Sequence, residues 1–516
     1  MQNEQSDRVI AALETAREGA DVDLLARVVH ENLWTLYDRH YEILLQAISE
    51  LPGRTLERYS VLRALHPMTP ALAASSAPFD ASSLDDVEAS ETVRDMIVVL
   101  QILTSRWNGD LRGSAEYARV LRARIYDLAV PDRAERGSNL WLLHGAVGSA
   151  LLLAGDTAGA VRELSTAREV ARCSGSTNGE RSVLGRQALA EVLRGSVADA
   201  QRSLAAARAL PPLTAAYAPE AQAETIADLL VSLEAGGIEE PERVQQLLHL
   251  EPTAFTWSFV ALAKARYFLL SGRPFEAIEA ARVAASTHRT QDGTLPADIL
   301  ARVYIESFLM LGRERAAQRA ALVVKEPGPL AVTALARLAL ARGDLDAAAR
   351  YIRDLSSEAW SSPAREADLV CLRTWEVVAR DTVGPESARR FASLVTNPHA
   401  RRAVLSTPRW VVEAIVAAMP DDQRAIVDAA IEGLTFPELG RSTLNLTASE
   451  RRVFAALATH ARVADLASAL FLSPNTVKTH LSSLYRKLGV SSRREAIEMH
   501  SVLISDPEAE PQVMVG

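Results

Sequence analysis

The chain has 516 residues, a net charge of −9 at pH 7 and only 5% aromatic residues. Alanine and leucine dominate it, which favours helices over sheets, and the length exceeds that of one ordinary domain. The acidity argues against nucleic-acid binding by the chain as a whole, so any such function must reside in a basic part. We therefore expect an all-α protein with several domains.

Targeting and membrane signals are missing from the sequence. The first residues, MQNEQSDR, are polar, whereas a secretory signal is basic and then apolar. The apolar stretch at 255–270 is broken by Lys264 and Arg266, so it falls short of the roughly 20 apolar residues of a membrane span. The sequence predicts a cytoplasmic protein without membrane contact.

Motifs for catalysis and for metal or cofactor binding are also missing. The phosphate-loop pattern GxxxxGK[ST], GxSxG and HExxH do not occur. Cys173 and Cys371 lie far apart without histidines at metal-ligand spacing, and we expect both to be buried as small apolar residues. We predict no catalytic residues, no metal, no cofactor and no enzymatic activity.

The N-terminal part divides at a change in composition. Residues 1–66 read as an N-terminal helical segment, because apolar residues recur there at helical spacing. Residues 67–90 are rich in proline, serine, alanine and aspartate, which predicts a loop or linker. Helical patterns resume at residue 91 and continue to residue 432.

A local pattern recurs between residues 91 and 432. A helix ends at a glycine, a polar residue usually follows, and a small residue stands five positions after the glycine. Glycine suits a left-handed helix end, and the small residue lets two helices approach closely. The pattern therefore predicts helical hairpins with the glycine and small-residue pairs Gly109 and Ser114, Gly155 and Ala160, Gly195 and Ala200, Gly272 and Ala277, Gly312 and Ala317, and Gly343 and Ala348.

Most of these glycines are about 40 residues apart, and an additional turn at Gly236-Gly237 divides the longest interval. Such spacing is typical of stacked helix-pair solenoids. At these residues the chain resembles tetratricopeptide-like repeats. That resemblance implies a surface for a protein partner or a small effector, although a scaffold or spacer role is the alternative.

The C-terminal part differs from the rest in charge. Residues 433–445 contain proline and glycine and read as a linker, residues 446–504 form a module, and the acidic tail 505–516 is expected to be disordered. Between Thr447 and Leu503 there are eight basic and four acidic residues, which gives this stretch a net charge of +4 and leaves −13 for the rest of the chain. A basic module thus follows an acidic body.

The module pattern is that of four short helices. Thr447 and Glu450 have capping-box spacing, a short helix follows with Leu466 and Leu470 apolar, and a final helix starts near Ser491 or Ser492. The third helix begins at Ser473-Pro474, a strong start signal, and Gly489 is expected to end it. Its apolar stripe is Val477, Leu481, Leu484 and Leu488, and its polar face carries Lys478, Ser482 and Arg486. This order of helices predicts a helix-turn-helix.

Here the sequence closely resembles the C-terminal DNA-binding domain of LuxR-type transcriptional regulators. The resemblance rests on Leu446-Thr447, Glu450, Leu466-Ala467, Leu470, Leu472-Ser473, Thr476-Val477-Lys478, His480, Lys487-Leu488-Gly489-Val490, Arg493 and Ala496. The segment LPGRTLERYSVLRAL also looks like the large ATP-dependent members of the family, whose ATPase domain this chain lacks.

The resemblance implies a set of DNA-binding residues. The side chains expected to contact base edges are Lys478, Thr479 and Ser482. Those expected to contact phosphates are Asn475, Thr476, His480, Arg486 and Lys487. An N-terminal lysine of a recognition helix can donate to guanine acceptors, while hydroxyl and cationic groups bind the backbone. Two of the chain's four lysines, Lys478 and Lys487, lie in this one helix.

We therefore predict a sequence-specific regulator that binds double-stranded DNA through the module and senses an effector or partner through the repeats. Family members usually bind DNA as dimers through the last helix, so the resemblance implies a homodimer on DNA with residues 492–503 as the interface. The alternative is an interaction scaffold whose degenerate module does not bind DNA.

Overall fold

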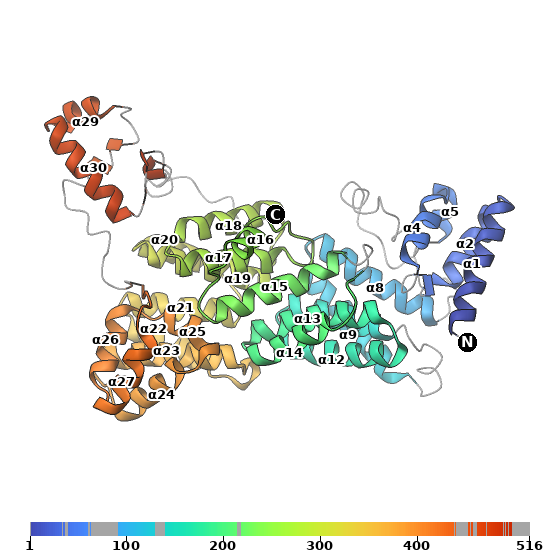
Figure 1. Ribbon diagram of the computed structural model, residues 1–516, viewed down its shortest axis with the longest axis horizontal. Coiled ribbons are helices and arrows are strands. Elements are labelled where there is room, and N and C mark those ends of the chain that lie inside the picture. Colours follow the sequence, from blue (N-terminus) through green and yellow to red (C-terminus); the bar gives the residue numbers. More distant parts are fainter. Residues whose placement is uncertain are drawn as a thin grey trace. The chain divides into compact units, whose positions relative to one another are not determined.

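The computed structural model is helical wherever it shows regular structure. It describes residues 2–33, 35–36, 40–59, 62, 91–128, 140–213, 218–437, 439, 453–454, 456–457, 462–470, 472–488, 490, 492–493 and 495–497. Every regular element within these residues is a helix, which confirms the predicted all-α fold (Figure 1). The linker predicted at 67–90 and the tail at 505–516 lie outside the described residues.

The described part of the chain divides into two compact units, and each unit is made of three segments that are separate in the sequence. Unit 1 holds residues 1–263, 288–298 and 362–365, and unit 2 holds residues 264–287, 299–361 and 366–516. Consequently α17 (Trp257–Leu270), α19 (Leu295–Met310) and α23 (Pro363–Ala379) each run from one unit into the other.

Unit 1 consists of helices that pack against their neighbours along the chain. Most of these helices pack against the next one along the chain, and some also pack against the next but one, as α13 does with α14 and α15 (Figure 1). This is the packing of stacked helix pairs. The helices are α1 (Gln2–Glu18), α2 (Val22–Glu31), α4 (Tyr41–Ser49), α5 (Gly53–Arg58), α8 (Glu91–Trp107), α9 (Leu111–Asp127), α11 (Leu140–Leu153), α12 (Thr157–Ser174), α13 (Thr177–Arg194), α14 (Val197–Arg208), α15 (Ala218–Glu234) and α16 (Pro241–Leu248).

The predicted glycine turns are confirmed. All six glycines have a positive φ between 66° and 94°, the conformation that glycine adopts without strain. The small residue five positions on is 0% exposed in the five alanine turns and 1% exposed at Ser114. Where aspartate follows glycine, as at Asp156, its carboxylate accepts a hydrogen bond from the N–H three residues later. The local sequence thus both ends one helix and starts its partner.

One turn does not follow the predicted pattern. Gly175 also has a positive φ, of 71°, and ends α12, while Ser176 caps α13. The residue five positions after Gly175 is Glu180, which is not small, so the sequence pattern does not detect this turn. The tetratricopeptide likeness itself stays a prediction.

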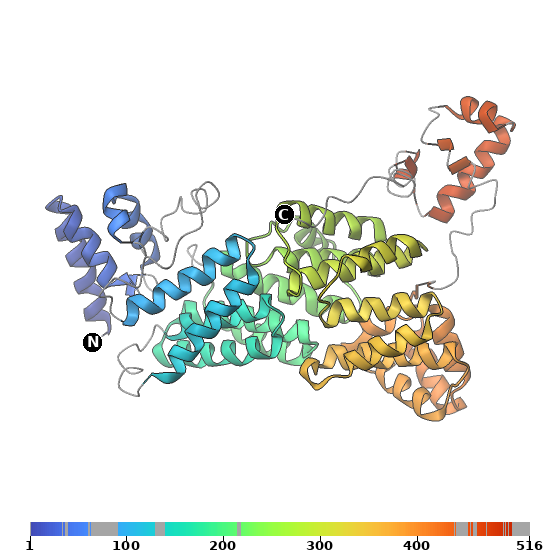
Figure 2. The ribbon, with the colours of Figure 1, turned by 180° about the vertical axis from the view of Figure 1, so that it is seen from behind.

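Unit 2 repeats the paired arrangement (Figure 2). The pair α21 and α22 packs across the turn at Gly343, and α24 contacts α25, α26 and α27. Besides the shared helices and those of the C-terminal module, unit 2 contains α18 (Pro274–Thr287), α20 (Glu314–Leu322), α21 (Pro329–Ala341), α22 (Leu345–Leu355), the 3₁₀ turns η4 (Glu358–Trp360) and η5 (Pro398–Ala400), α24 (Pro385–Val395), α25 (Arg401–Leu405), α26 (Arg409–Ala417) and α27 (Asp421–Ile431).

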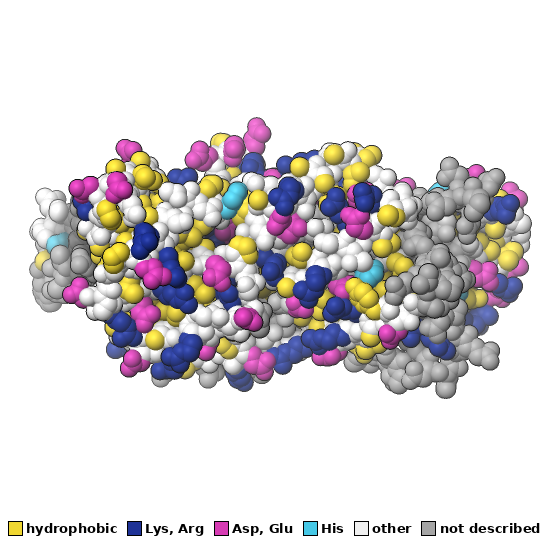
Figure 3. All heavy atoms as spheres, turned by 90° about the horizontal axis from the view of Figure 1, so that it is seen from below, with side chains coloured by type: hydrophobic (Ala, Val, Ile, Leu, Met, Phe, Trp, Pro, Cys, Tyr) yellow, Lys and Arg dark blue, Asp and Glu magenta, His cyan; other side chains and the backbone are white. Residues whose placement is uncertain are grey.

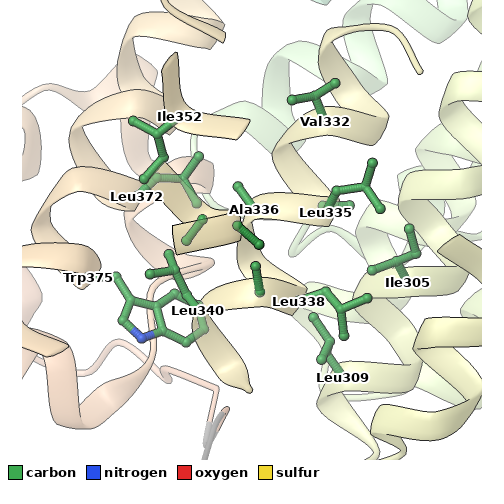
Figure 4. Close-up of a cluster of buried hydrophobic side chains, with 14 of the residues drawn as sticks. Ile305, Leu309, Val332, Leu335, Ala336, Leu338, Leu340, Ile352, Leu372 and Trp375 are labelled. Carbon is green, nitrogen blue, oxygen red and sulfur yellow. The ribbon is translucent and has the colours of Figure 1, made fainter. Parts of the chain in front are cut away.

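The largest core of unit 2 surrounds α21, which is buried along nearly its whole length. On one side Leu335 and Leu338 face Ile305 and Leu309 of α19, and on the other side Leu340 lies near Ile352, Leu372 and Trp375 (Figure 4). The alanines of α21, such as Ala336, fill the positions between these larger side chains. A helix that is apolar all round is expected to be enclosed by its neighbours.

Charged side chains are also buried in unit 2. Asp368 of α23 accepts hydrogen bonds from Arg302 Nη1 at 3.2 Å and Arg337 Nη2 at 3.1 Å, and Arg402 Nη2 lies 3.7 Å away. Glu306 pairs with Arg302 at 3.0 Å and with Arg337. The positive charges hold the pKa of Asp368 well below its usual range, although burial alone would raise that pKa. These ion pairs join α19, α21, α23 and α25.

Part of the predicted linker at 433–445 packs onto unit 2. The Phe436 and Leu439 side chains are each only 6% exposed. The Trp410 Nε1–H donates to the Leu439 carbonyl at 3.0 Å, and the Arg409 N–H donates to the Pro437 carbonyl at 3.0 Å. We call residues 434–437 and 439 the strap. Its apolar side chains explain why a segment with linker composition packs at its start; residues 440–452 lie outside the described residues.

One of the two cysteine predictions is wrong. Cys371 is buried, and burial raises the pKa of its thiol to about 11. Cys173, in contrast, is exposed. It follows Ala171, a buried residue of α12, by two positions, which turns its side chain to the opposite face of the helix.

The surface mixes the two signs of charge. Basic and acidic side chains lie interspersed over the face shown in Figure 3. Exposed pairs such as Arg282 with Glu279 are one helical turn apart, and each stabilises its helix by only a few tenths of a kcal/mol. Among the helices that the structure describes, none combines the length and apolarity of a membrane span.

The turn at Gly195 provides a test of close helix packing. A Cβ at Gly195 would lie 2.4 Å from the Ala364 backbone nitrogen, whereas a Cβ at Gly155 meets no atom within 4 Å. Both substitutions to alanine incur about 1–2 kcal/mol from the positive φ. Overpacking should cost Gly195→Ala about 1–3 kcal/mol more. Urea unfolding followed by circular dichroism should show the larger loss for Gly195→Ala, and equal losses would contradict the clash.

The buried ion pairs provide a second test. Asp368→Asn removes one of the two buried carboxylates and leaves Glu306 alone with three buried arginines, which should cost about 3–5 kcal/mol of unfolding free energy. Glu386→Gln is the matched control, since it breaks the exposed Arg390–Glu386 pair and should cost about 1 kcal/mol or less. Denaturant unfolding of both variants measures the difference.

The same carboxylate predicts a pH dependence. The pKa of Asp368 is lower in the folded protein than in the unfolded chain. The stability that its ionised carboxylate contributes is therefore fully present above its ordinary pKa of about 3.9 and is lost as the pH falls further. The stability difference between the parent protein and Asp368→Asn should therefore narrow below about pH 4. A difference that stays constant through this range would contradict the ionised state assigned to Asp368.

Candidate nucleic-acid interface

The module 446–504 has its own small core around α29 (Val463–Leu470) and α30 (Pro474–Leu488). Residues 453–454 and 456–457 are helical and contribute to this core from the first helix of the module. The members are Val453, Phe454, Leu457, Leu466, Ala467, Val477, Leu481, Leu484 and Ala496. The predicted capping box of Thr447 and Glu450 lies outside the described residues.

The start of α30 agrees with the sequence prediction. Ser473 Oγ accepts a hydrogen bond from the Thr476 N–H at 3.1 Å and lies 2.7 Å from Thr476 Oγ1. Pro474 occupies the first helical position, where no N–H partner is needed. The turn before it is closed by the Leu472 N–H, which donates to the Ala467 carbonyl at 2.9 Å. This turn and cap fix where α30 begins relative to α29.

The two faces of α30 differ as predicted. Val477 and Leu484 are 0% exposed and Leu481 is 6% exposed, so the apolar stripe holds the helix in the module core. At the end of α30 the Val490 N–H donates to the Tyr485 carbonyl at 3.0 Å, which is the bond of a closed helix C-terminus. The Leu488 side chain and Gly489, the predicted end of the helix, lie outside the described residues.

The predicted DNA-binding residues lie along α30. Asn475, Thr476, Lys478, Thr479 and Ser482 are exposed, and His480 is half-buried. Arg486 and Lys487 belong to the last turn of α30, but their side chains are outside the described residues. One capped helix thus presents most of the predicted set to solvent.

The exposed groups offer both donors and acceptors. Thr479 Oγ1 donates to the Asn475 carbonyl at 3.0 Å, so its proton is used within the helix while its methyl group and lone pairs face outward. The Lys478 ammonium has three donors on a flexible stem, which suits acceptor atoms on a base edge or a phosphate. This face has the chemistry to bind an acceptor-rich, anionic surface.

The last helix of the module is fixed at its start. Ser492 Oγ accepts from the Glu495 N–H at 3.2 Å and donates to Glu495 Oε1 at 2.8 Å, and Ala496 is fully buried. Serine followed three residues later by glutamate is a readable helix-start signal. Arg493 Nη2 donates to the Leu457 carbonyl at 3.2 Å, a contact that the sequence does not reveal. Of the predicted dimer interface 492–503, residues 494 and 498–503 lie outside the described residues.

The described part of the chain carries no cluster of metal-ligating side chains. No group of three or more histidine, cysteine, aspartate or glutamate side chains there is arranged to hold a metal ion. The functional candidate rests on the groups that α30 exposes.

Comparison with known proteins places the module in a family. Residues 444–500 match the model of bacterial regulatory proteins of the luxR family. The spore germination protein GerE of Bacillus subtilis is 42% identical over 52 residues, which are 10% of this chain and 70% of that protein.

Two further relatives are longer than the matched region. The probable transcriptional regulatory protein SgaR of Hyphomicrobium methylovorum is 42% identical over 82 residues, which are 15% of this chain and 39% of that protein. The probable transcriptional regulatory protein NarL of Mycobacterium tuberculosis is 44% identical over 52 residues, which are 10% of this chain and 24% of that protein. This chain therefore spans well under half the length of these two relatives.

The cap at Ser473 should be measurable as stability of the module. Ser473→Ala removes the acceptor for the Thr476 N–H and should cost about 1 kcal/mol. Ser482→Ala is the matched control, because Ser482 is exposed within α30 and alanine there favours the helix. Hydrogen exchange at the first turn of α30 should become faster only in Ser473→Ala; similar exchange in both variants would remove the assigned role of the cap.

Proposed function

Because the chain belongs to the LuxR family of bacterial regulatory proteins through residues 444–500, we propose that it is a transcriptional regulator that binds specific sites on double-stranded DNA. The observation that carries this proposal is the exposed polar face of α30, held in position by the Ser473 cap and the buried stripe. Two relatives bear the name transcriptional regulatory protein, which supports the same function.

The proposed contacts divide the face of α30 by chemistry. Lys478, Thr479 and Ser482 read base edges, since a lysine on the exposed face can donate to guanine O6 and N7. The phosphates bind a second set of hydroxyl, amide, imidazole and cationic groups, which fix the orientation of the helix without reading sequence. This second set is Asn475, Thr476, His480, Arg486 and Lys487.

The remaining parts of the proposal concern assembly and control. The module pairs with a second copy on DNA through residues 492–503, so the target contains two half-sites about one helical turn apart. The paired helices of residues 91–432 bind a protein partner or a small effector and thereby control the module. Helical repeats commonly offer such extended binding surfaces.

A substitution of Lys478 tests base reading. Lys478→Ala should weaken binding to a selected genomic fragment by about 1–3 kcal/mol, or roughly 5- to 150-fold, because one base contact is lost. The affinity of the full chain is measured by gel shift or fluorescence anisotropy at several salt concentrations. The parent protein should show a steep salt dependence, as expected for phosphate contacts.

Lys325→Ala is the matched control, since it removes the same side chain and charge from outside the module. It should bind DNA as the parent protein does. The competing function is that of an interaction scaffold whose module does not bind DNA. Binding that ignores sequence and is unchanged in Lys478→Ala would favour the scaffold and overturn the proposed regulator.

A further inference from the structure

We infer that Arg493 is a positioning residue for the recognition helix α30, which it holds against the first helix of the module. This inference rests on the proposed DNA binding and goes beyond it, because it assigns a role in specificity to a side chain outside α30. The alternative for an arginine at this place in a basic module is direct contact with a phosphate.

The first support is a hydrogen bond across the module. Arg493 Nη2 donates to the Leu457 carbonyl at 3.2 Å, although the two residues are 36 positions apart. Leu457 is itself 0% exposed and belongs to the module core. A guanidinium that donates to a carbonyl forms a charge-assisted bond, which is stronger than a bond between neutral groups. The contact therefore ties the last helix to the first.

The second support is the neighbourhood of Arg493. Partial burial raises the pKa of the Tyr485 phenol, and the nearby positive charge of Arg493 opposes that rise. Tyr485 packs against the module core and accepts the bond from the Val490 N–H that closes α30. The charge of Arg493 thus acts on Tyr485 of α30, while its hydrogen bond reaches Leu457 in the core that α30 shares.

The third support is the hydrogen-bonded helical turn that contains Arg493. Ser492 caps the helix immediately before it, and the fully buried Ala496 follows three residues later. The Ala496 N–H donates to the Ser492 carbonyl at 3.0 Å, so residue 493 lies within a closed helical turn. A half-buried guanidinium on such a backbone is preorganised, and a positioning group has to be preorganised to fix its neighbours.

The consequence is a division of labour. A phosphate contact strengthens binding to every DNA sequence alike, whereas a positioning residue affects the contacts that read bases. Loss of Arg493 should therefore reduce the preference for the operator over other DNA. It should leave the electrostatic part of binding unchanged.

The experiment compares Arg493→Ala, Arg493→Lys and the control Arg462→Ala in the full chain. Arg462 is exposed in the same module, so the control removes the same charge from its surface. Affinities for a selected operator fragment and for unrelated DNA are measured over a range of salt concentrations. Hydrogen exchange at the Val490 amide is measured without DNA.

For Arg493→Ala we expect roughly tenfold weaker operator binding, about the effect of one mismatched base pair, with an unchanged salt slope. Binding to unrelated DNA should change by less than about twofold, and exchange at Val490 should become faster. Arg493→Lys should recover part of the operator affinity, because lysine can donate to the Leu457 carbonyl without the planar fork of arginine.

Three outcomes would overturn the inference. A salt slope that falls by about one in Arg493→Ala, together with full operator affinity in Arg493→Lys, would identify a phosphate contact. If Arg493→Ala loses affinity equally for the operator and for unrelated DNA, in proportion to the fraction of unfolded protein, Arg493 is a purely structural residue. If the parent protein binds its operator but Arg493→Ala leaves hydrogen exchange at the Val490 amide unchanged, the positioning role of Arg493 is refuted while the proposed function stands. If the parent protein selects no sequence, the proposed function itself fails, whatever the exchange shows.

Discussion

The repeat region depends on how closely its paired helices approach at each turn. At five turns the small residue after the glycine is a fully buried alanine, which lets the paired helices approach closely. The glycine before it adopts a left-handed conformation, which lets the chain reverse within a few residues. Because protein interiors are close-packed, a larger side chain in place of one of these alanines has to displace a neighbouring helix. The same short device, repeated along the chain, therefore builds most of the protein.

Buried charge adds a second kind of constraint in unit 2. Packing of alanine and leucine is permissive, since many side-chain arrangements fill similar volumes. Ion pairs are directional, and the bonds of Asp368 to Arg302 and Arg337 are satisfied only when α19, α21 and α23 lie in one register. We attribute to these pairs a role in specifying that register, because buried pairs seldom add net stability over apolar packing.

Local features of this protein could be predicted from its sequence, and non-local ones could not. The turns at glycine and the cap at Ser473 depend on residues within five positions of each other, so their patterns are visible along the chain. The bond from Arg493 to Leu457 spans 36 positions and leaves no such pattern. The sequence does not predict the strap for another reason. The proline and glycine of residues 433–445 indicate a linker, whereas the burial of Phe436 depends on the apolar side chains of unit 2 around it.

The strap also sets the length over which the module is tethered. The chain is anchored at Leu439, and the first described residue of the module core, Val453, is 14 positions further on. A chain of that length spans at most roughly 50 Å. That limit is also the largest distance at which Val453 can lie from the end of the strap. Because Trp410 and Arg409 bind the strap, these two residues of α26 shorten the chain between α26 and the module core, and loss of their bonds would lengthen it.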